Sequence, residues 1–321
     1  MIPRLDIHFG IKHKFLWFFG KEYSPIENEF LLNHNRSGLY LALKALGLPK
    51  GSKVGMMAYN CHTVMNAIWQ AGLEAVFIDV NDKLTLDLND LAQKSKGLSA
   101  LIVTHLFGNY SDICSIRDLV PSIPIIEDCA HAYSNILCGI HGDFAVYSIG
   151  AGKNPSIGDG GILKVNNRDY LPVIKETYSI IPSASFKDNI KLFLSLSIKS
   201  ILYCPFIYKA FTLRIKEKRS IDLTNQKPER LTRMAKGIRR IFGSTYYKSH
   251  YNDTPFMSVE YCENPINRRE DYLRLGIDTD THFKNCIIWA RSYGYCPGDC
   301  PNAENLVNHL LMIPTYQNRK Q

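Results

Sequence analysis

The stretch GDFAVYSIGAGKNPSIGDGGILKV, residues 142–165, contains two apolar runs of strand length separated by a loop of small and turn-forming residues. The loop carries a single lysine, Lys153. A long cationic side chain with so little bulk around it indicates a group that reaches into an open site.

Similar apolar runs alternate with helical patterns over the preceding part of the chain. Between several of the runs lie amphipathic segments of helical period, SGLYLALKALGL, TVMNAIWQAG and DLNDLAQKS. This alternation predicts an α/β domain with a mainly parallel sheet that helices cover on both faces. The predicted strands are residues 53–59, 74–80, 100–108, 123–128, 143–149 and 161–165.

Polar residues follow the predicted strands at the edge where such sheets bind ligands, beyond the carboxyl ends of the strands. Asp128 ends one strand and Ser148 lies near the end of the next, both a short distance before Lys153. GAGK resembles the end of a phosphate-binding P-loop, but that motif needs Gly at 147 and Ser or Thr at 154. The chain has Tyr147 and Asn154, so a P-loop is excluded.

Composition narrows the class of protein. The chain has 321 residues, of which 45% are hydrophobic, enough for a folded protein of about two domains. Nine cysteines without framework spacing, and an N-terminal apolar patch broken by charges, predict reduced thiols and a cytoplasmic protein. The cysteine pair Cys296 and Cys300 lacks a second pair at zinc-site spacing, so we expect no metal.

Lysine chemistry suggests a use for Lys153. A lysine whose pKa is lowered becomes a nucleophile that condenses with an aldehyde, such as that of pyridoxal 5'-phosphate (PLP). This cofactor also needs a carboxylate at its ring nitrogen and donors for its phosphate. Asp128 and Ser148 are residues of the right types for these two roles.

Several segments, in order, resemble the PLP-dependent nucleotide-sugar aminotransferases of the DegT/StrS type. They are VTHLFG, IPIIEDCAHAYSN and residues 142–165, and the resemblance runs with gaps from about residue 30 to 166. It resumes in LGIDTDTHF and CPNAENLVNHLLMIPTY near the C-terminus. The resemblance implies the type I, aspartate-aminotransferase-like PLP transferase fold, with a mainly parallel central sheet and a smaller C-terminal α+β domain.

The same resemblance assigns expected roles to site residues. Lys153 would bind the cofactor aldehyde and move the proton between cofactor and substrate, and Asp128 would pair with the pyridine nitrogen. His131 would lie beside the ring, and Ser148 would donate to the phosphate. Each of these residues also has an ordinary structural role open to it, such as a strand-end cap or a turn hydroxyl. A glycine turn would leave room beside the lysine, formed by Gly158, Gly160 and Gly161.

The chain departs from the family pattern at two places in the expected cofactor site. The family commonly has Gly-Thr before the first long helix, where this chain has Asn35 and Arg36, followed by Ser37. A helix N-terminus still favours an anion, so Arg36 and Ser37 are expected near the phosphate, with a solvent-facing arginine as the alternative. Cys61, next to His62, stands where an aromatic residue often stacks on the cofactor, and offers only a soft contact.

A third departure lies after Tyr178, where no match to the family's Asn-x-Arg motif is found. A basic segment follows, and residues 187–248 hold 15 Lys and Arg against 4 Asp and Glu. Lys191, Lys199 and Lys209 interrupt its apolar runs, which argues against a transmembrane helix. Two alternatives remain open: a basic amphipathic surface on anionic lipid, or ordinary packed helices with a solvated basic face. Nucleic acid is not expected, because no binding motif is present.

The sequence thus predicts four parts and one function. The parts are an N-terminal arm (1–29), a large PLP-binding domain (30–180), a basic insertion (181–254) and a small C-terminal domain (255–321). The expected function is transfer of an amino group, by family analogy from glutamate, to a nucleotide-linked keto-sugar in polysaccharide or glycan biosynthesis, by a cytoplasmic homodimer with possible peripheral membrane contact. The alternative is a non-catalytic or membrane-associated relative that serves as a binding subunit. Sugar dehydration is disfavoured, because the family's dehydratases have histidine in place of the lysine.

Overall fold

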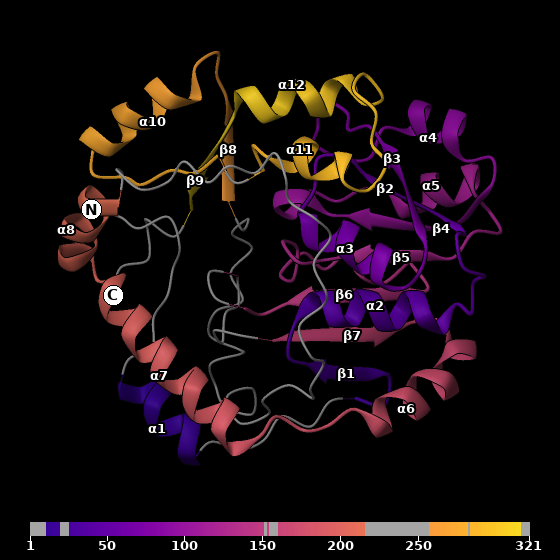
Figure 1. Ribbon diagram of the computed structural model, residues 1–321, viewed down its shortest axis with the longest axis horizontal. Coiled ribbons are helices and arrows are strands. Elements are labelled where there is room, and N and C mark those ends of the chain that lie inside the picture. The colour runs from indigo at the N-terminus through magenta and orange to yellow at the C-terminus, as the bar shows by residue number, and fades with distance from the viewer. Residues whose placement is uncertain are drawn as a thin grey trace.

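A computed structural model of the protein describes residues 11–19, 26–150, 153, 160–215, 257–281 and 283–315 (Figure 1). The helices are α1 (Ile11–Phe19), α2 (Asn35–Ala45), α3 (His62–Gln70), α4 (Leu88–Lys94), α5 (Ile113–Leu119), α6 (Leu171–Ile180), α7 (Phe186–Leu202), α8 (Pro205–Ile215), α10 (Pro265–Arg274), α11 (Cys286–Arg291) and α12 (Pro301–His309). The strands are β1 (Glu29–Leu32), β2 (Lys53–Met57), β3 (Glu74–Ile78), β4 (Leu98–Thr104), β5 (Ile125–Asp128), β6 (Phe144–Ser148), β7 (Gly161–Val165), β8 (Met257–Tyr261) and β9 (Leu310–Pro314).

Seven strands form the central sheet in the order β1-β7-β6-β5-β4-β2-β3. The five strands from β6 to β3 run parallel, and β7 and β1 are antiparallel to their neighbours. The predicted mainly parallel sheet with helices around it is confirmed. Because β4, β5 and β6 are parallel neighbours, their carboxyl ends meet at one edge, and that edge receives the loops that follow Thr104, Asp128 and Ser148.

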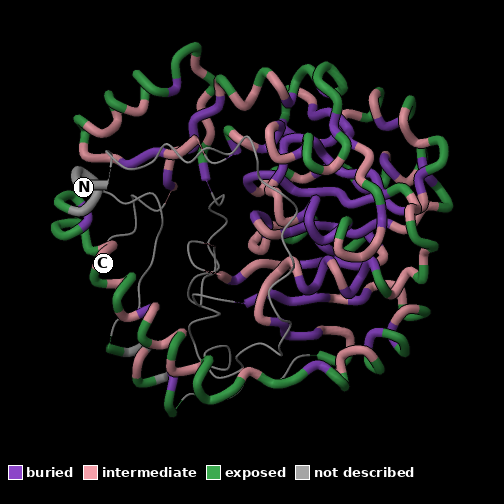
Figure 2. Tube along the Cα trace, viewed as in Figure 1, coloured by how far each residue is buried: buried purple, intermediate pink, exposed green. Residues whose placement is uncertain are grey.

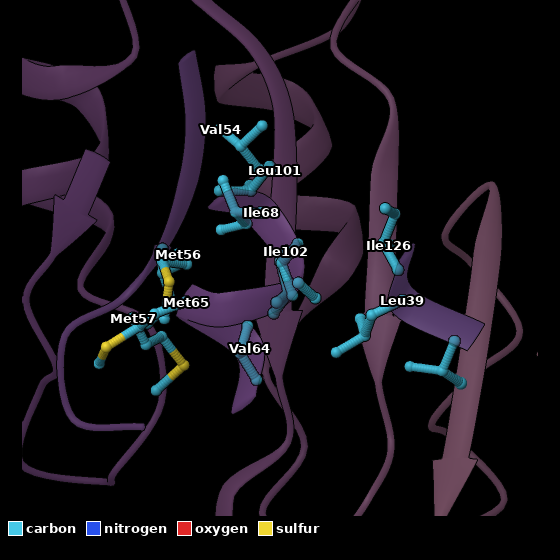
Figure 3. Packing of buried hydrophobic residues seen from close by; sticks show 14 of the residues in the cluster. Leu39, Val54, Met56, Met57, Val64, Met65, Ile68, Leu101, Ile102 and Ile126 are labelled. Atoms are coloured by element: carbon cyan, nitrogen blue, oxygen red, sulfur yellow. The ribbon is translucent and has the colours of Figure 1, made fainter. Parts of the chain in front are cut away.

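Burial explains why the chain forms these strands. The strand β4 (LSALIVT) is buried at every position except Ser99, as expected for a parallel strand covered on both faces. Figure 2 shows the buried segments concentrated in the sheet and its flanking helices. Figure 3 shows Leu39 of α2 and three side chains of α3 against apolar residues of β2, β4 and β5. Burial of such side chains stabilises the domain by about 1.5–3 kcal/mol each.

The structure differs from the sequence prediction at the end of β4. We expected a strand to continue to Gly108, but it ends at Thr104, and a short 3₁₀ turn covers residues 106–108. Phe107 has φ +56° and Gly108 has φ +96°, both in the left-handed region that an extended strand excludes. Strand β1 was also not expected as part of the sheet.

The C-terminal part builds on a two-stranded antiparallel ribbon, β8-β9, with α10, α11 and α12 beside it (Figure 1). Asp79, which follows β3, ties this part to the large sheet. Its carboxylate accepts the backbone N–H groups of Asn302 at 2.9 Å and Ala303 at 2.8 Å in the first turn of α12. Cys300 is the N-cap residue of α12, but its side chain accepts no hydrogen bond from the first turn. Asp79, from the loop after β3, supplies the acceptor that this helix end lacks.

We predict that Asp79→Ala lowers the free energy of unfolding by about 2 kcal/mol, because two N–H donors at a helix N-terminus lose a charged acceptor. Urea denaturation followed by circular dichroism measures the loss. The matched control is Asp82→Ala, which removes an exposed carboxylate of the same loop and is expected to change stability by less than about 0.5 kcal/mol. Equal stability of the two variants would contradict the proposed tie.

Candidate active site

Lys153 lies beyond the carboxyl end of β6, in the loop that joins β6 to β7. Its backbone N–H donates to the Gly150 carbonyl at 3.1 Å. Burial lowers the pKa of its amine to about 8, although the negative charges of Cys61 and Asp128 act in the opposite direction. At a pH equal to this pKa, half of the protein molecules carry Lys153 as a neutral amine, which is the nucleophilic form. The predicted glycine Gly158 lies outside the described residues.

Asp128 is the last residue of β5 and is 2% exposed. Its Oδ1 accepts the side-chain N–H of Asn35 and the backbone N–H of Ala130, both at 3.1 Å. Its Oδ2 lies 3.5 Å from the Thr104 hydroxyl, a long hydrogen bond. Burial raises the pKa of Asp128, and the N–H donors and Lys153 oppose that rise. The carboxylate is therefore well held on one oxygen and weakly held on the other.

The N-terminus of α2 approaches Asp128 from the neighbouring layer. A Cβ on Gly161 would lie 2.5 Å from the Asn35 backbone nitrogen, so only glycine lets β7 come this close to the helix end. His34 pairs with Gly160 in a β-bridge at the same place. Arg36 Nε is buried without a hydrogen-bond partner, and so is Asn35 Oδ1. These two polar atoms leave bonding capacity for a bound group.

Cys61 precedes α3 and is half-buried. The Thr63 hydroxyl donates to its sulfur at 3.1 Å, and the His62 ring nitrogen Nδ1 lies 4.0 Å from it. Burial alone would raise the pKa of this thiol, but the contacts with His62 and Thr63 outweigh burial and lower that pKa to about 6. Cys61 is therefore a source of negative charge close enough to Lys153 to raise the pKa of the lysine.

His131 lies among aromatic rings, 8% exposed. The backbone N–H of Phe107 donates to its Nδ1 at 3.3 Å, and the Phe107 ring stacks on the imidazole with 5.6 Å between centroids. Phe283, from the C-terminal part, stacks on His131 at 5.9 Å and contacts Tyr59 edge-on at 5.4 Å. Phe283 thus connects the C-terminal part with the edge of the large sheet that carries the candidate site.

Glu127 and His105 form a buried hydrogen-bonded pair beside the site. The His105 Nε2–H donates to the Glu127 carboxylate at 2.9 Å, and both side chains are 0% exposed. Glu127 also accepts the backbone N–H groups of Gly139, His141 and Gly142. These bonds hold the loop between β5 and β6 against the end of β5. Cys129 lies close enough for a three-ligand metal cluster, but the hydrogen bonds already use both nitrogens of His105 and both oxygens of Glu127.

The structure brings together most of the residues that the sequence singled out. Asp128 and Cys61 both lie within electrostatic reach of Lys153, and Asn35 at the start of α2 hydrogen-bonds Asp128. The Ser37 hydroxyl instead donates to Asn33 at 3.2 Å. His131 and Ser148 lie at the ends of the neighbouring strands, and their roles stay predictions. Sequence reasoning missed contributors that strand-end position could have suggested, namely Asn60, Thr104 and His105.

Comparison with known proteins shows what the part of the chain that carries this site is similar to. Residues 30–180 match the model of the DegT/DnrJ/EryC1/StrS aminotransferase family. The GDP-perosamine synthase of Vibrio cholerae is 28% identical over 158 residues, 47% of this chain and 43% of that protein. The chain therefore spans less than half the length of this relative. Over residues 30–180 the chain is similar to the DegT/DnrJ/EryC1/StrS aminotransferase family.

Longer matches extend the likeness over the whole chain. The UDP-4-amino-4,6-dideoxy-N-acetyl-beta-L-altrosamine transaminase of Campylobacter jejuni (strain 81-176) is 24% identical over 327 residues, 92% of this chain and 82% of that protein. The crystal structure of the sugar aminotransferase CalS13 from Micromonospora echinospora superposes with a TM-score of 0.65 at 20% identity, covering 98% of this chain and 95% of that one. The chain has the fold of sugar aminotransferases.

We predict that competitive acetylation of the cofactor-free protein, with mass spectrometry of the Lys153 peptide, gives half-maximal reactivity near pH 8. In the urea-unfolded chain the same amine should titrate near the ordinary lysine value of about 10.4. Asp128→Asn should move the folded midpoint to lower pH, because the negative charge of Asp128 raises the pKa of Lys153. If the midpoint rises or stays unchanged in Asp128→Asn, the charge of Asp128 does not act on Lys153, and the proposed proximity of the two residues is wrong.

Proposed function

We propose that the protein is a PLP-dependent aminotransferase that moves an amino group from an amino acid, with glutamate as the donor, to a keto-sugar carried on a nucleotide. The observation that carries this proposal is the juxtaposition of a buried carboxylate, Asp128, with a lysine whose pKa is lowered to about 8 at the ligand-binding edge of the sheet. A neutral amine and an ionised carboxylate are the two groups that PLP chemistry requires of the protein.

The residues present fit this cofactor. When bound, PLP supplies an aldehyde for amino-group exchange and a ring that withdraws electrons from the reacting carbon. Lys153 would bind the aldehyde carbon and hold the proton that moves at the substrate carbon. Asp128 would bind the ring nitrogen through Oδ2, which among the described residues has a single, long hydrogen bond. The buried, unpartnered Nε of Arg36 and the first turn of α2 would hold the phosphate.

The remaining predicted contacts complete this arrangement. His131 would lie beside the ring, where Phe107 and Phe283 fix its imidazole. Cys61 would contact the ring with a soft sulfur atom in place of the more common aromatic. The Ser148 hydroxyl would donate a hydrogen bond to the phosphate, and the backbone of Ser37 would face the same phosphate.

The catalytic proposal is preferred to the alternative of a non-catalytic binding subunit. Such a subunit would have no need of a buried carboxylate and a lysine of lowered pKa at one strand edge, because an unneeded buried charge destabilises the fold. The substrate class comes from the relatives, whose names specify a GDP-linked and a UDP-linked sugar. We therefore propose a nucleotide-linked keto-sugar as acceptor and a place in polysaccharide or glycan biosynthesis.

Lys153→Ala tests the function directly. The purified wild-type protein should show the visible absorption of bound PLP that borohydride bleaches, and it should transfer amino groups to a nucleotide-linked keto-sugar. Lys153→Ala should lose the borohydride-sensitive absorption and lower turnover by about 10³-fold or more, because no other amine replaces its proton transfer. The matched control is Lys164→Ala, a lysine of the adjacent strand β7. Equal turnover of wild type and Lys153→Ala would refute the assignment.

The assembly is proposed to be a homodimer, which is the commonest symmetric assembly of soluble proteins and is implied by the family resemblance. The four parts proposed from the sequence are retained: 1–29, 30–180, 181–254 and 255–321. The family match over 30–180 supports the large domain. Ribbon β8-β9 and helices α10 to α12 support the C-terminal part as a unit of its own.

We also propose that the basic insertion makes peripheral contact with an anionic membrane, because α1 and α7 form an exposed apolar and basic surface. Trp17 of α1 and Leu196 of α7 are buried against each other, with the Trp17 and Phe193 rings 5.8 Å apart. Three other apolar side chains of α7, at helical spacing, are each more than half exposed: Leu194, Ile198 and Ile201. The side chains of Phe15 and Phe19 on α1 are exposed as well.

Lysines make this surface complementary to anionic lipid. Lys187, Lys191 and Lys199 are exposed on α7, and Figure 2 shows the exposure that runs along α7 and α8. Aromatic and leucine side chains with interspersed lysines are typical of helices that lie in the membrane interface. Among the described residues no helix combines the length and the apolar character needed to cross a bilayer. The rest of the segment, 216–248, lies outside the described residues.

Liposome co-sedimentation tests the membrane contact. The full-length protein should bind vesicles with anionic lipid and not neutral vesicles, and high salt should release it, because each basic residue near the surface contributes about 1 kcal/mol that salt screens. Changing Lys187, Lys191 and Lys199 to Gln together should weaken binding strongly. The matched control changes three exposed lysines of the large domain, Lys50, Lys83 and Lys96, and should leave binding nearly unchanged. Salt-insensitive behaviour equal on both vesicle types would leave α7 as an ordinary packed helix.

A further inference from the structure

We propose that Asn35 is a positioning residue for Asp128: its side-chain amide fixes the carboxylate so that Oδ2 faces the cofactor ring nitrogen. This inference rests on the proposed function, because it concerns the residue that would bind that nitrogen. Asn35 stands where the family commonly has glycine, which has no side chain. The amide is therefore a feature of this chain that the family pattern does not supply.

The two oxygens of Asp128 differ in their hydrogen bonds. A carboxylate oxygen has two lone pairs that accept hydrogen bonds. Oδ1 accepts two N–H groups, from the Asn35 side chain and the Ala130 backbone, each at 3.1 Å. Oδ2 has the Thr104 hydroxyl at 3.5 Å. Oδ1 is thus saturated, and Oδ2 retains capacity for a strong hydrogen bond from a ring N–H.

The Thr104 hydroxyl, which makes the long bond to Oδ2, is itself oriented by Asn60. Asn60 donates its side-chain N–H to Thr104 Oγ1 at 2.8 Å, and Oδ1 of the same side chain accepts the backbone N–H of Cys61 at 2.7 Å. Because Thr104 accepts from Asn60, its single hydroxyl proton is directed to Asp128. The carboxylate is therefore oriented by two amides, one on each side, and Asn35 is the one that bonds it directly.

The backbone delivers the Asn35 amide to a fixed place. Asn35 is the first residue of α2, and Gly161 approaches its backbone nitrogen so closely that a Cβ would lie 2.5 Å away. The bridge between His34 and Gly160 holds the preceding residue on the same strand end. Oδ1 of Asn35 is buried without a partner, so the amide is held by its contact with Asp128 rather than by a competing donor.

The charges around Asp128 decide what loss of the amide does. Burial raises the pKa of Asp128, and the groups that oppose the rise are the Ala130 N–H, the Asn35 amide and the charges of Lys153 and His105. When the amide is removed, the pKa of Asp128 rises further. Since the ionised carboxylate is the form that binds a protonated ring nitrogen, cofactor affinity should then begin to fall at a higher pH as the solution is acidified.

The experiment titrates the cofactor-free full-length protein with PLP at several pH values and follows the change in intrinsic fluorescence. Asn35→Ala is expected to weaken PLP binding about tenfold at neutral pH and to move the acid limb of affinity upward. Asn35→Asp, which keeps the shape of the side chain and replaces the donor with a second negative charge, is expected to weaken binding more and to shift the limb further.

Asn33→Ala is the matched control, because it removes an asparagine at the same helix end whose side chain accepts from the Ser37 hydroxyl. The described residues that hydrogen-bond the Asp128 carboxylate are Asn35, Thr104 and Ala130. It should bind PLP as the wild type does. Unchanged affinity in Asn35→Ala and Asn35→Asp would overturn the inference, and so would tighter binding in Asn35→Ala, which would place the amide in the space of the ring. Failure of the wild-type protein to bind PLP would instead refute the proposed function.

Discussion

Burial of the Asp128 carboxylate is the constraint on which the rest of the site depends. A charged group removed from water is tolerated only when donors and opposite charge surround it. Each element near Asp128 supplies one of these: the Ala130 backbone, the Asn35 amide at the start of α2, the Thr104 hydroxyl at the end of β4, and the charge of Lys153. The close approach of β7 to α2, which requires Gly161, serves the same arrangement.

Glu127 and Asp128, the last two residues of β5, have different roles: one is structural and the other is available for binding. Successive side chains of a strand point to opposite faces, so Glu127 and Asp128 face different surroundings. Glu127 is saturated by His105 and three backbone N–H groups, which lowers its pKa against the effect of burial. Asp128 keeps an oxygen with spare capacity. The saturated carboxylate holds the loop, and the unsaturated one is available for binding.

Much of this organisation could be predicted from the sequence, because it depends on local pattern. The strands of the parallel sheet follow from apolar runs, and the positions of Asp128 and Lys153 follow from the rule that ligands bind beyond strand ends. Contacts between distant segments could not be predicted. The bond from Asn35 to Asp128 joins residues 93 apart, the pairing of Trp17 with Leu196 joins opposite parts of the chain, and Phe283 reaches His131 through folding alone. The turn at Phe107 was missed because a phenylalanine with positive φ has no local sequence signal.

Lys153, held beside Asp128, is the residue that we propose binds PLP. The most direct measurement is peptide mapping: the wild-type protein is incubated with PLP, reduced with borohydride and digested, and the lysine that carries the cofactor is located by mass spectrometry. We expect stoichiometric labelling of the peptide that contains Lys153, with other lysines labelled only in trace. Labelling spread over the exposed lysines, with Lys153 unmodified, would contradict it.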